Sequence, residues 1–131
     1  MSDYIDVAGK KLPTLLALTA DEQAKGLQYA AWPPPVMSFV YATSRINKYW
    51  MHKVPSPLDI VFSNKGIITS ICYGEPYSTR IIGDDNPSDL IVEFPLDTCK
   101  ELGIKIGDSI KLECGEKSQM RIFALKNGFV F

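Results

Sequence analysis

The stretch LDIVFSNKGIITSICY, residues 58–73, decides the fold. It contains two apolar runs of strand length around the turn residues Asn64-Lys65-Gly66, which is typical of a β-hairpin. Alternate residues from Leu58 to Phe62 share one face of the first run, and Val61 is apolar on the other face. We therefore expect a strand that is buried on much of both faces.

Further short apolar runs lie on both sides of this hairpin, separated by prolines, glycines and polar turns. They predict strands at 4–8, 11–18, 36–41, 46–52, 90–94, 110–114, 120–125 and 129–131. No long helices alternate with these strands, so a parallel α/β sheet is not expected. The prediction is one mainly β domain over 1–131, an antiparallel sandwich or barrel of jelly-roll type.

Two short helices and a closing hairpin complete the prediction. Thr19 and Glu22 have capping-box spacing, which predicts a helix that ends near Leu27. Residues 95–102 begin with a proline and are followed by Gly103, as a short helix requires. The segment 119–131 is predicted as a C-terminal hairpin around Lys126-Asn127-Gly128.

Composition excludes several classes of protein. The chain has 131 residues, 46% of them hydrophobic and 22% charged, which fits one globular domain. Its 14 basic and 15 acidic residues provide no strong attraction to nucleic acid or to an anionic membrane. No segment approaches the roughly 20 apolar residues of a membrane helix. The N-terminal residues do not resemble a signal peptide, so we expect a cytoplasmic protein without membrane contact.

The metal-binding residue types are few. The three cysteines are Cys72, Cys99 and Cys114, and their odd number and wide spacing do not form a disulfide framework. A closed zinc site would need all three together with His52, the single histidine. We expect reduced cysteines that pack as small apolar residues, and neither a metal nor a cofactor.

Several motifs occur in the order found in a known family. They are YWMHKVPSPLDIVF at 49–62, KGL at 25–27, VMSF at 36–39, IVEF at 91–94 and LGIKIGD at 102–108. Together they resemble the domain of unknown function 192 family over residues 15–112. One departure is that His52-Lys53-Val54 follow the Trp-Met pair, where the family has Lys-Asn-Thr.

This resemblance implies a β-sandwich of jelly-roll type, and it brings no established activity. Many members of that family carry a secretion signal. A fold does not supply a function either. Candidate site residues must therefore come from the sequence itself.

Four residues are candidates for a binding site. In a strand, Trp50 and His52 point to one face, and Asp59 follows within ten positions. An aromatic ring, an imidazole and a carboxylate can line a small-molecule pocket. The alternative is that Trp50 fills the core and His52 lies on the surface. Glu93 is a lone acid in an apolar strand, either in the site or facing solvent.

The acids also have structural interpretations. Asp59 can accept hydrogen bonds from backbone N–H groups of the loop 53–56 and fix its shape. If Asp59 and Glu93 converge, acid–base chemistry becomes possible. Asp84, Asp85 and Asp89 lie in a polar loop without the spacing of a calcium site, so we expect a solvated turn.

Three functions follow from these observations. The favoured one is a binding or accessory module, whose loops 33–35 and 74–87 contact a small molecule or a protein partner. The second is a small hydrolase or carbohydrate-active enzyme that uses Asp59, Glu93 and His52 in one pocket with Trp50. The third and least favoured is single-stranded nucleic-acid binding, through an exposed patch of Tyr41, Arg45, Lys48 and Tyr49. The sequence leaves catalysis and the oligomeric state open.

Overall fold

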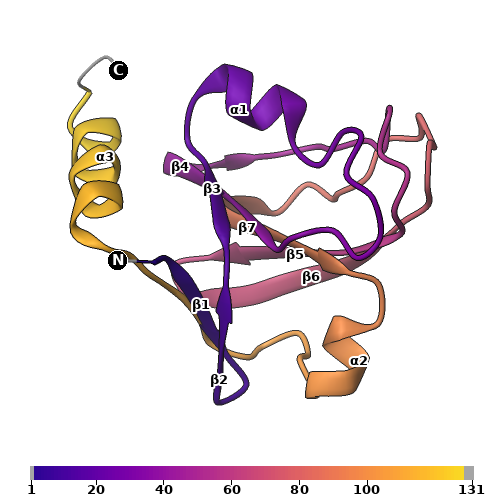
Figure 1. Ribbon diagram of the computed structural model, residues 1–131. Coiled ribbons are helices and arrows are strands. Elements are labelled where there is room, and N and C mark those ends of the chain that lie inside the picture. The colour runs from indigo at the N-terminus through magenta and orange to yellow at the C-terminus, as the bar shows by residue number, and fades with distance from the viewer. Residues whose placement is uncertain (1, 129–131) are drawn as a thin grey trace.

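The computed structural model describes residues 2–128, which form two β-sheets and three helices (Figure 1). The strands are β1 Tyr4–Val7, β2 Lys10–Pro13, β3 Leu15–Ala17, β4 Met37–Ile46, β5 Leu58–Asn64, β6 Ile67–Gly74, β7 Pro87–Pro95 and β8 Ile110–Glu113. The helices are α1 Ala20–Lys25, α2 Thr98–Leu102 and α3 Glu116–Lys126. The sheets have the orders β2-β1-β8 and β3-β4-β7-β5-β6.

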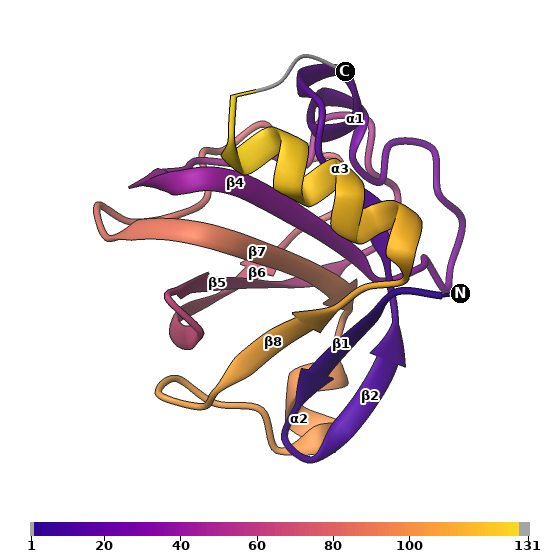
Figure 2. The same ribbon diagram turned by 90° about the vertical axis from the view of Figure 1, so that its left-hand side faces the viewer.

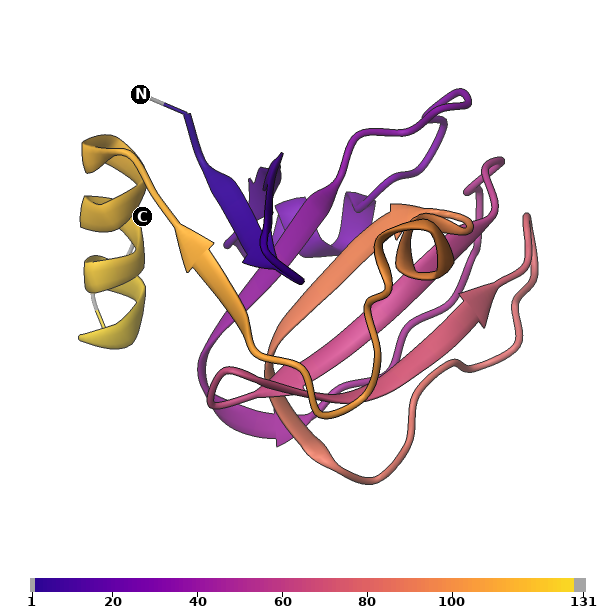
Figure 3. The ribbon, with the colours of Figure 1, turned by 90° about the horizontal axis from the view of Figure 1, so that it is seen from below.

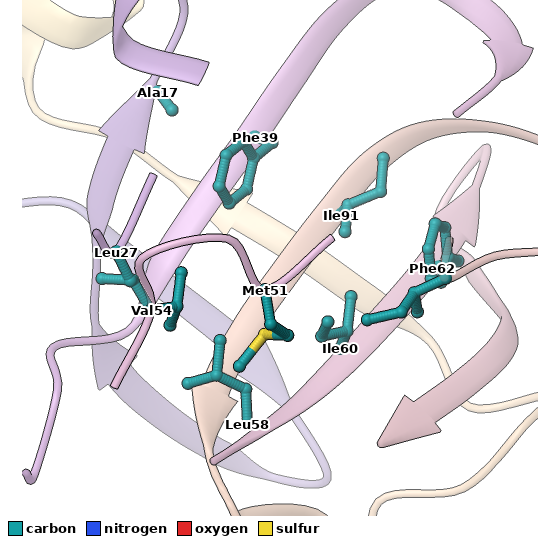
Figure 4. Packing of buried hydrophobic residues seen from close by; sticks show 10 residues of the cluster. Ala17, Leu27, Phe39, Met51, Val54, Leu58, Ile60, Phe62 and Ile91 are labelled. Atoms are coloured by element: carbon teal, nitrogen blue, oxygen red, sulfur yellow. The ribbon is translucent and has the colours of Figure 1, made fainter. Parts of the chain in front are cut away.

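The hairpin at 58–73 is confirmed, and β5 is its buried member. Strand β5 pairs with β6 on one side and with β7 on the other, both antiparallel. One of its faces, with Val61, packs in a core between the two sheets that includes Ile5 of β1 and Ile110 of β8. The other face, with Leu58, Ile60 and Phe62, packs in a second core with Met51 and Phe39 (Figure 4). The sheet is thus covered on both sides.

The fold is mainly β, with two separate sheets rather than a closed barrel (Figure 2). A jelly roll has two four-stranded sheets, whereas these sheets have three and five strands, so that comparison is not confirmed. The strand pairs are antiparallel except for β3 and β4, which run parallel.

The predicted strand 11–18 is divided in two. Pro13 ends β2, which is an edge strand of the three-stranded sheet. Proline has no backbone N–H, and at this edge position no hydrogen bond to a neighbouring strand is lost. Thr14 then turns the chain: its N–H donates to the Asp3 carbonyl, and its hydroxyl hydrogen-bonds the hydroxyl of Ser38 at 2.7 Å. Strand β3 begins directly afterwards in the other sheet, so this residue transfers the chain between the sheets.

The predicted strand 46–52 is wrong. Strand β4 extends to Ile46 through a bulge between Val40 and Arg45, and the chain then leaves the sheet. Residues beyond it are held by long-range bonds, because Tyr49 exchanges both backbone hydrogen bonds with Ile82 as an isolated bridge. Because the partner of this segment is so distant along the chain, its conformation cannot be predicted from the neighbouring residues.

The predicted C-terminal hairpin is also wrong, since residues 116–126 form α3; residues 129–131 lie outside the described part. The segment is rich in good helix formers, and that propensity prevails over the short apolar alternation. Asp3 anchors the start of the helix, accepting hydrogen bonds from the Gly115 N–H and the Ser118 hydroxyl. Helix α3 follows β8 at the outer side of the molecule and lies along β4 (Figures 2 and 3).

The capping box of α1 is confirmed and gives a first testable prediction. The Thr19 hydroxyl accepts from the Glu22 N–H at 3.1 Å, and the Glu22 carboxylate accepts from the Thr19 N–H at 3.0 Å. We expect Thr19→Ala to lower the free energy of unfolding by about 1 kcal/mol. Urea unfolding measures this, with Thr43→Ala on the exposed end of β4 as control. Equal losses in both variants would contradict the capping role.

Candidate functional site

A pocket of about 360 Å³ lies between α1, the end of β4 and the segment 48–54. We call it the Glu93 pocket, after the one carboxyl group that lines it within residues 2–128. Its volume is at the lower end of the range for small-molecule sites. Phe39 and Val54 of the second core provide apolar lining. The other side chains used below are Tyr41, Arg45, Lys48, Tyr49, Trp50 and His52.

Glu93 is buried in the middle of the five-stranded sheet. In the strand register it lies opposite Ile60 of β5 and Met37 of β4, so it faces the second core and not solvent. The residue is 4% exposed. Among residues 2–128 no hydrogen bond or ion pair is formed by its carboxyl group. Burial raises the pKa of that carboxyl to about 8, so the neutral acid predominates at pH 7.

Two tyrosine hydroxyls meet in the pocket. The Tyr41 and Tyr49 oxygens are 2.5 Å apart and hydrogen-bonded. The Tyr49 ring packs against Phe39 and Phe62, with ring centroids 5.2 and 5.8 Å away. Burial raises the pKa of the Tyr49 phenol, and the Tyr41 hydroxyl and the Glu93 carboxyl raise it further. Tyr49 is therefore a neutral, fixed hydrogen-bonding group at physiological pH.

The Arg45 guanidinium is held in place from two sides. Its Cζ lies 4.4 Å from the centre of the Tyr41 ring, a cation–π contact. Its Nε donates to the Asn47 Oδ1 at 2.8 Å. Asn47 is itself buried, and its amide nitrogen donates to the Ser88 carbonyl and hydroxyl. Lys48, in contrast, pairs with Asp85 at 3.3 Å.

The segment after β4 carries the aromatic wall. Met51 is buried in the second core (Figure 4). Trp50 is 49% exposed, so it does not fill the core. The Trp50 and His52 rings lie together, with centroids 4.8 Å apart. The predicted alternation of side chains is therefore correct here, although the backbone is not a strand.

Asp59 lies on the opposite face of the sheet from Glu93. It is opposite Phe94 in the register, and Phe94 belongs to the core between the sheets. Its carboxylate accepts from the Cys99 N–H at 3.0 Å, so the predicted donor loop 53–56 was wrong. Asp59 and Glu93 therefore do not lie in one pocket. The enzyme hypothesis required both acids in the same pocket, and the structure does not bring them together.

Two other predicted surfaces have mixed outcomes. Tyr41, Arg45, Lys48 and Tyr49 do come together, but they line the Glu93 pocket, and the Tyr49 ring is packed between phenylalanines. These four residues therefore do not form the exposed row of rings on which bases would stack. Trp32, in the three-proline loop, is 56% exposed, as a contact loop requires. A protein partner stays a prediction.

A larger groove of about 700 Å³ lies between α3, β4 and β8. Three of the acidic and amide side chains that line it are engaged with neighbours. Asp89 accepts from the Lys65 N–H, Glu113 pairs with Lys11 at 3.0 Å, and Gln119 donates to the Cys114 carbonyl. The Glu93 pocket, with an unpartnered buried carboxyl group, is therefore the better candidate site.

Comparison with known proteins shows which protein family the chain belongs to. The model of the DUF192 family, described as an uncharacterized ACR, matches residues 4–112. The chain belongs to the DUF192 family. The resemblance stated from the sequence motifs is thereby confirmed. Among the curated proteins, none matches the chain.

Solved structures of similar proteins share the fold of this DUF192 chain. One is a "putative transcription regulator" from Sinorhizobium meliloti 1021, with a TM-score of 0.77 and 27% identity over 85% of this chain and 93% of that one. Another, from Novosphingobium aromaticivorans DSM 12444, is of unknown function, with a TM-score of 0.75 and 27% identity over 82% and 83% of the chains. These comparisons support the fold and an uncharacterised module.

The helices of this DUF192 chain are short. Within residues 2–128, none has the length and apolar character needed to cross a lipid bilayer.

Proposed function

We propose that this DUF192 protein binds a small polar molecule in the Glu93 pocket. The observation that carries the proposal is the Glu93 carboxyl group, which is buried, lines the pocket and has no partner in the described chain. Such a group costs stability unless something hydrogen-bonds to it. A ligand that donates to Glu93 supplies the missing bond.

The lining of the pocket supports recognition rather than catalysis. Phe39 and Val54 offer apolar contact, and the tyrosine hydroxyls and Arg45 offer a few fixed polar groups. Apolar walls with a small number of placed polar groups are typical of small-molecule sites. The groups are held by core residues, which favours binding without rearrangement.

The two tryptophans provide the test, because Trp50 lines the pocket and Trp32 does not. In the variant Trp32→Phe, Trp50 is the only tryptophan, and its emission can be excited selectively. We expect its emission to change saturably with at least one compound from a panel of the amino acids other than tryptophan and tyrosine, glucose, galactose, adenosine, cytidine and putrescine. We further expect Glu93→Gln to weaken that binding about tenfold or more.

The matched control is Asp89→Asn, which makes the same kind of change in the larger groove. It should leave the dissociation constant unchanged. The proposal is overturned if no compound in the panel binds, or if Glu93→Gln binds the compound as tightly as the parent does.

A further inference from the structure

We infer that the ligand of the Glu93 pocket is a zwitterion of amino-acid size, whose ammonium group binds Glu93 and whose carboxylate binds Arg45. This inference rests on the proposed function and names the chemical class of its ligand. It is carried by an acidic and a basic side chain, Glu93 and Arg45, that line one pocket and do not pair with each other.

The inner end of the pocket presents the acid. Glu93 lies deep in the sheet, and no cation of residues 2–128 forms an ion pair with it, although Arg45 and Lys48 line the same pocket. Because the Glu93 carboxyl group is buried with no cation paired to it, its pKa is raised and its neutral form is favoured. A ligand ammonium within hydrogen-bond reach restores the carboxylate and makes a charge-assisted hydrogen bond, which a neutral donor does not.

The outer end presents the cation. Arg45 is exposed, and its Nε is already used by Asn47, which fixes the plane of the guanidinium. Its two terminal nitrogens make no hydrogen bond within the described part of the chain. A planar guanidinium with free terminal nitrogens matches a carboxylate in a two-bond geometry. Lys48 is a weaker candidate for this role because Asp85 already neutralises it.

The tyrosine pair connects the two ends. The Tyr41 ring lies under the Arg45 guanidinium, and its hydroxyl bonds to Tyr49; the Glu93 carboxyl contributes to raising the pKa of the Tyr49 phenol. The two tyrosines therefore lie between the buried acid, Glu93, and the exposed base, Arg45. A ligand with one charge would leave the other end unmatched, whereas a zwitterion matches both.

Chemical derivatives of the ligand test each end separately. For the amino acid that changes Trp50 emission most in the Trp32→Phe protein, we would titrate the free amino acid, its N-acetyl derivative and its amide. The N-acetyl derivative lacks the ammonium, and the amide lacks the carboxylate. We expect each derivative to bind about tenfold or more weakly than the free amino acid.

Variants then assign each loss to a residue. In Glu93→Gln the free amino acid and its N-acetyl derivative should bind within about threefold of each other, because the ammonium has lost its partner. In Arg45→Gln the same should hold for the free amino acid and its amide. Arg80→Gln, an exposed arginine outside the pocket, is the control and should keep both preferences.

The outcomes separate this inference from the proposed function. If a hexose, a nucleoside or putrescine binds in a Glu93-dependent way and the amino acids do not, the zwitterion is wrong and the pocket stands. If the N-acetyl derivative or the amide binds as tightly as the free amino acid, the assignment of the corresponding charge is wrong. If no compound binds, both proposals fail.

Discussion

Glu93→Gln is expected to raise the free energy of unfolding at pH 7 by about 3 kcal/mol in the absence of ligand. The ordinary pKa of the carboxyl is 4.5, and burial raises it to about 8 in the folded protein. At pH 7 the unfolded chain carries the ionised form and the folded protein the neutral form. Folding must therefore take up a proton against its ordinary pKa, and glutamine, a neutral side chain of the same shape, does not incur this cost.

The effect has a defined pH window. Below about pH 4.5 the carboxyl is protonated in both states, so it adds no pH dependence. Between 4.5 and 8 the folded state binds more protons than the unfolded state, so stability falls as pH rises, by at most about 1.4 kcal/mol per pH unit. Above about pH 8 both states are ionised, and the difference between the two proteins becomes constant.

Urea unfolding of both proteins at pH 5, 6, 7 and 8 measures this difference. The gap between Glu93→Gln and the parent should widen with pH, and subtracting one curve from the other cancels the other titrating groups. Glu75→Gln, on the exposed loop after β6, is the control and should stay within about 0.5 kcal/mol of the parent at every pH. A gap that does not change with pH would contradict the buried, neutral acid.

A side chain that costs stability in the empty protein is informative about function. Strongly shifted pKa values caused by burial occur at functional sites more often than elsewhere. A binding site that keeps an unpaired carboxyl in a well-packed core loses stability until the ligand arrives. The same variant is expected to gain stability and lose binding, which a purely structural role for Glu93 does not predict.

The sequence predicted best what is local. The hairpin at 58–73 followed from the alternation of apolar residues around a turn, and the start of α1 followed from Thr19 and Glu22, three residues apart. The position of Tyr49 was missed because its backbone partner is Ile82. The helix at 116–126 was missed because a short apolar alternation was weighed above the helix propensity of its polar residues.

The same division applies to the candidate site. Trp50, His52 and Glu93 were predicted as binding residues, and all three line one pocket. Asp59 was grouped with them although strand pairing puts it on the other face of the sheet, which cannot be known before the register of β5 and β7 is known. Arg45 was predicted as part of an exposed nucleic-acid patch and not as a pocket residue, because the bulge in β4 that brings it to the pocket has no clear sequence signal.

Asp59→Ala is expected to lower the free energy of unfolding by about 2–4 kcal/mol, because this buried carboxylate replaces a missing helix cap. Asp97, the residue at the N-cap position of α2, makes no side-chain cap bond, and Asp59 of β5 instead accepts from the Cys99 N–H at 3.0 Å.

The Asp59 carboxylate acts on the Cys99 thiol as well as on its N–H. Burial and the neighbouring Asp59 raise the pKa of that thiol to about 12.

Alanine at position 59 leaves the buried Cys99 N–H without an acceptor, whereas Asp59→Asn retains an acceptor oxygen and should cost only about 1 kcal/mol. Asp97→Asn makes the same chemical change on the exposed cap and should cost less than about 0.5 kcal/mol. If the alanine variant unfolded at the same urea concentration as the asparagine variant, Asp59 would not be the cap, and the bond from β5 to α2 would contribute nothing to holding the helix against the sheet.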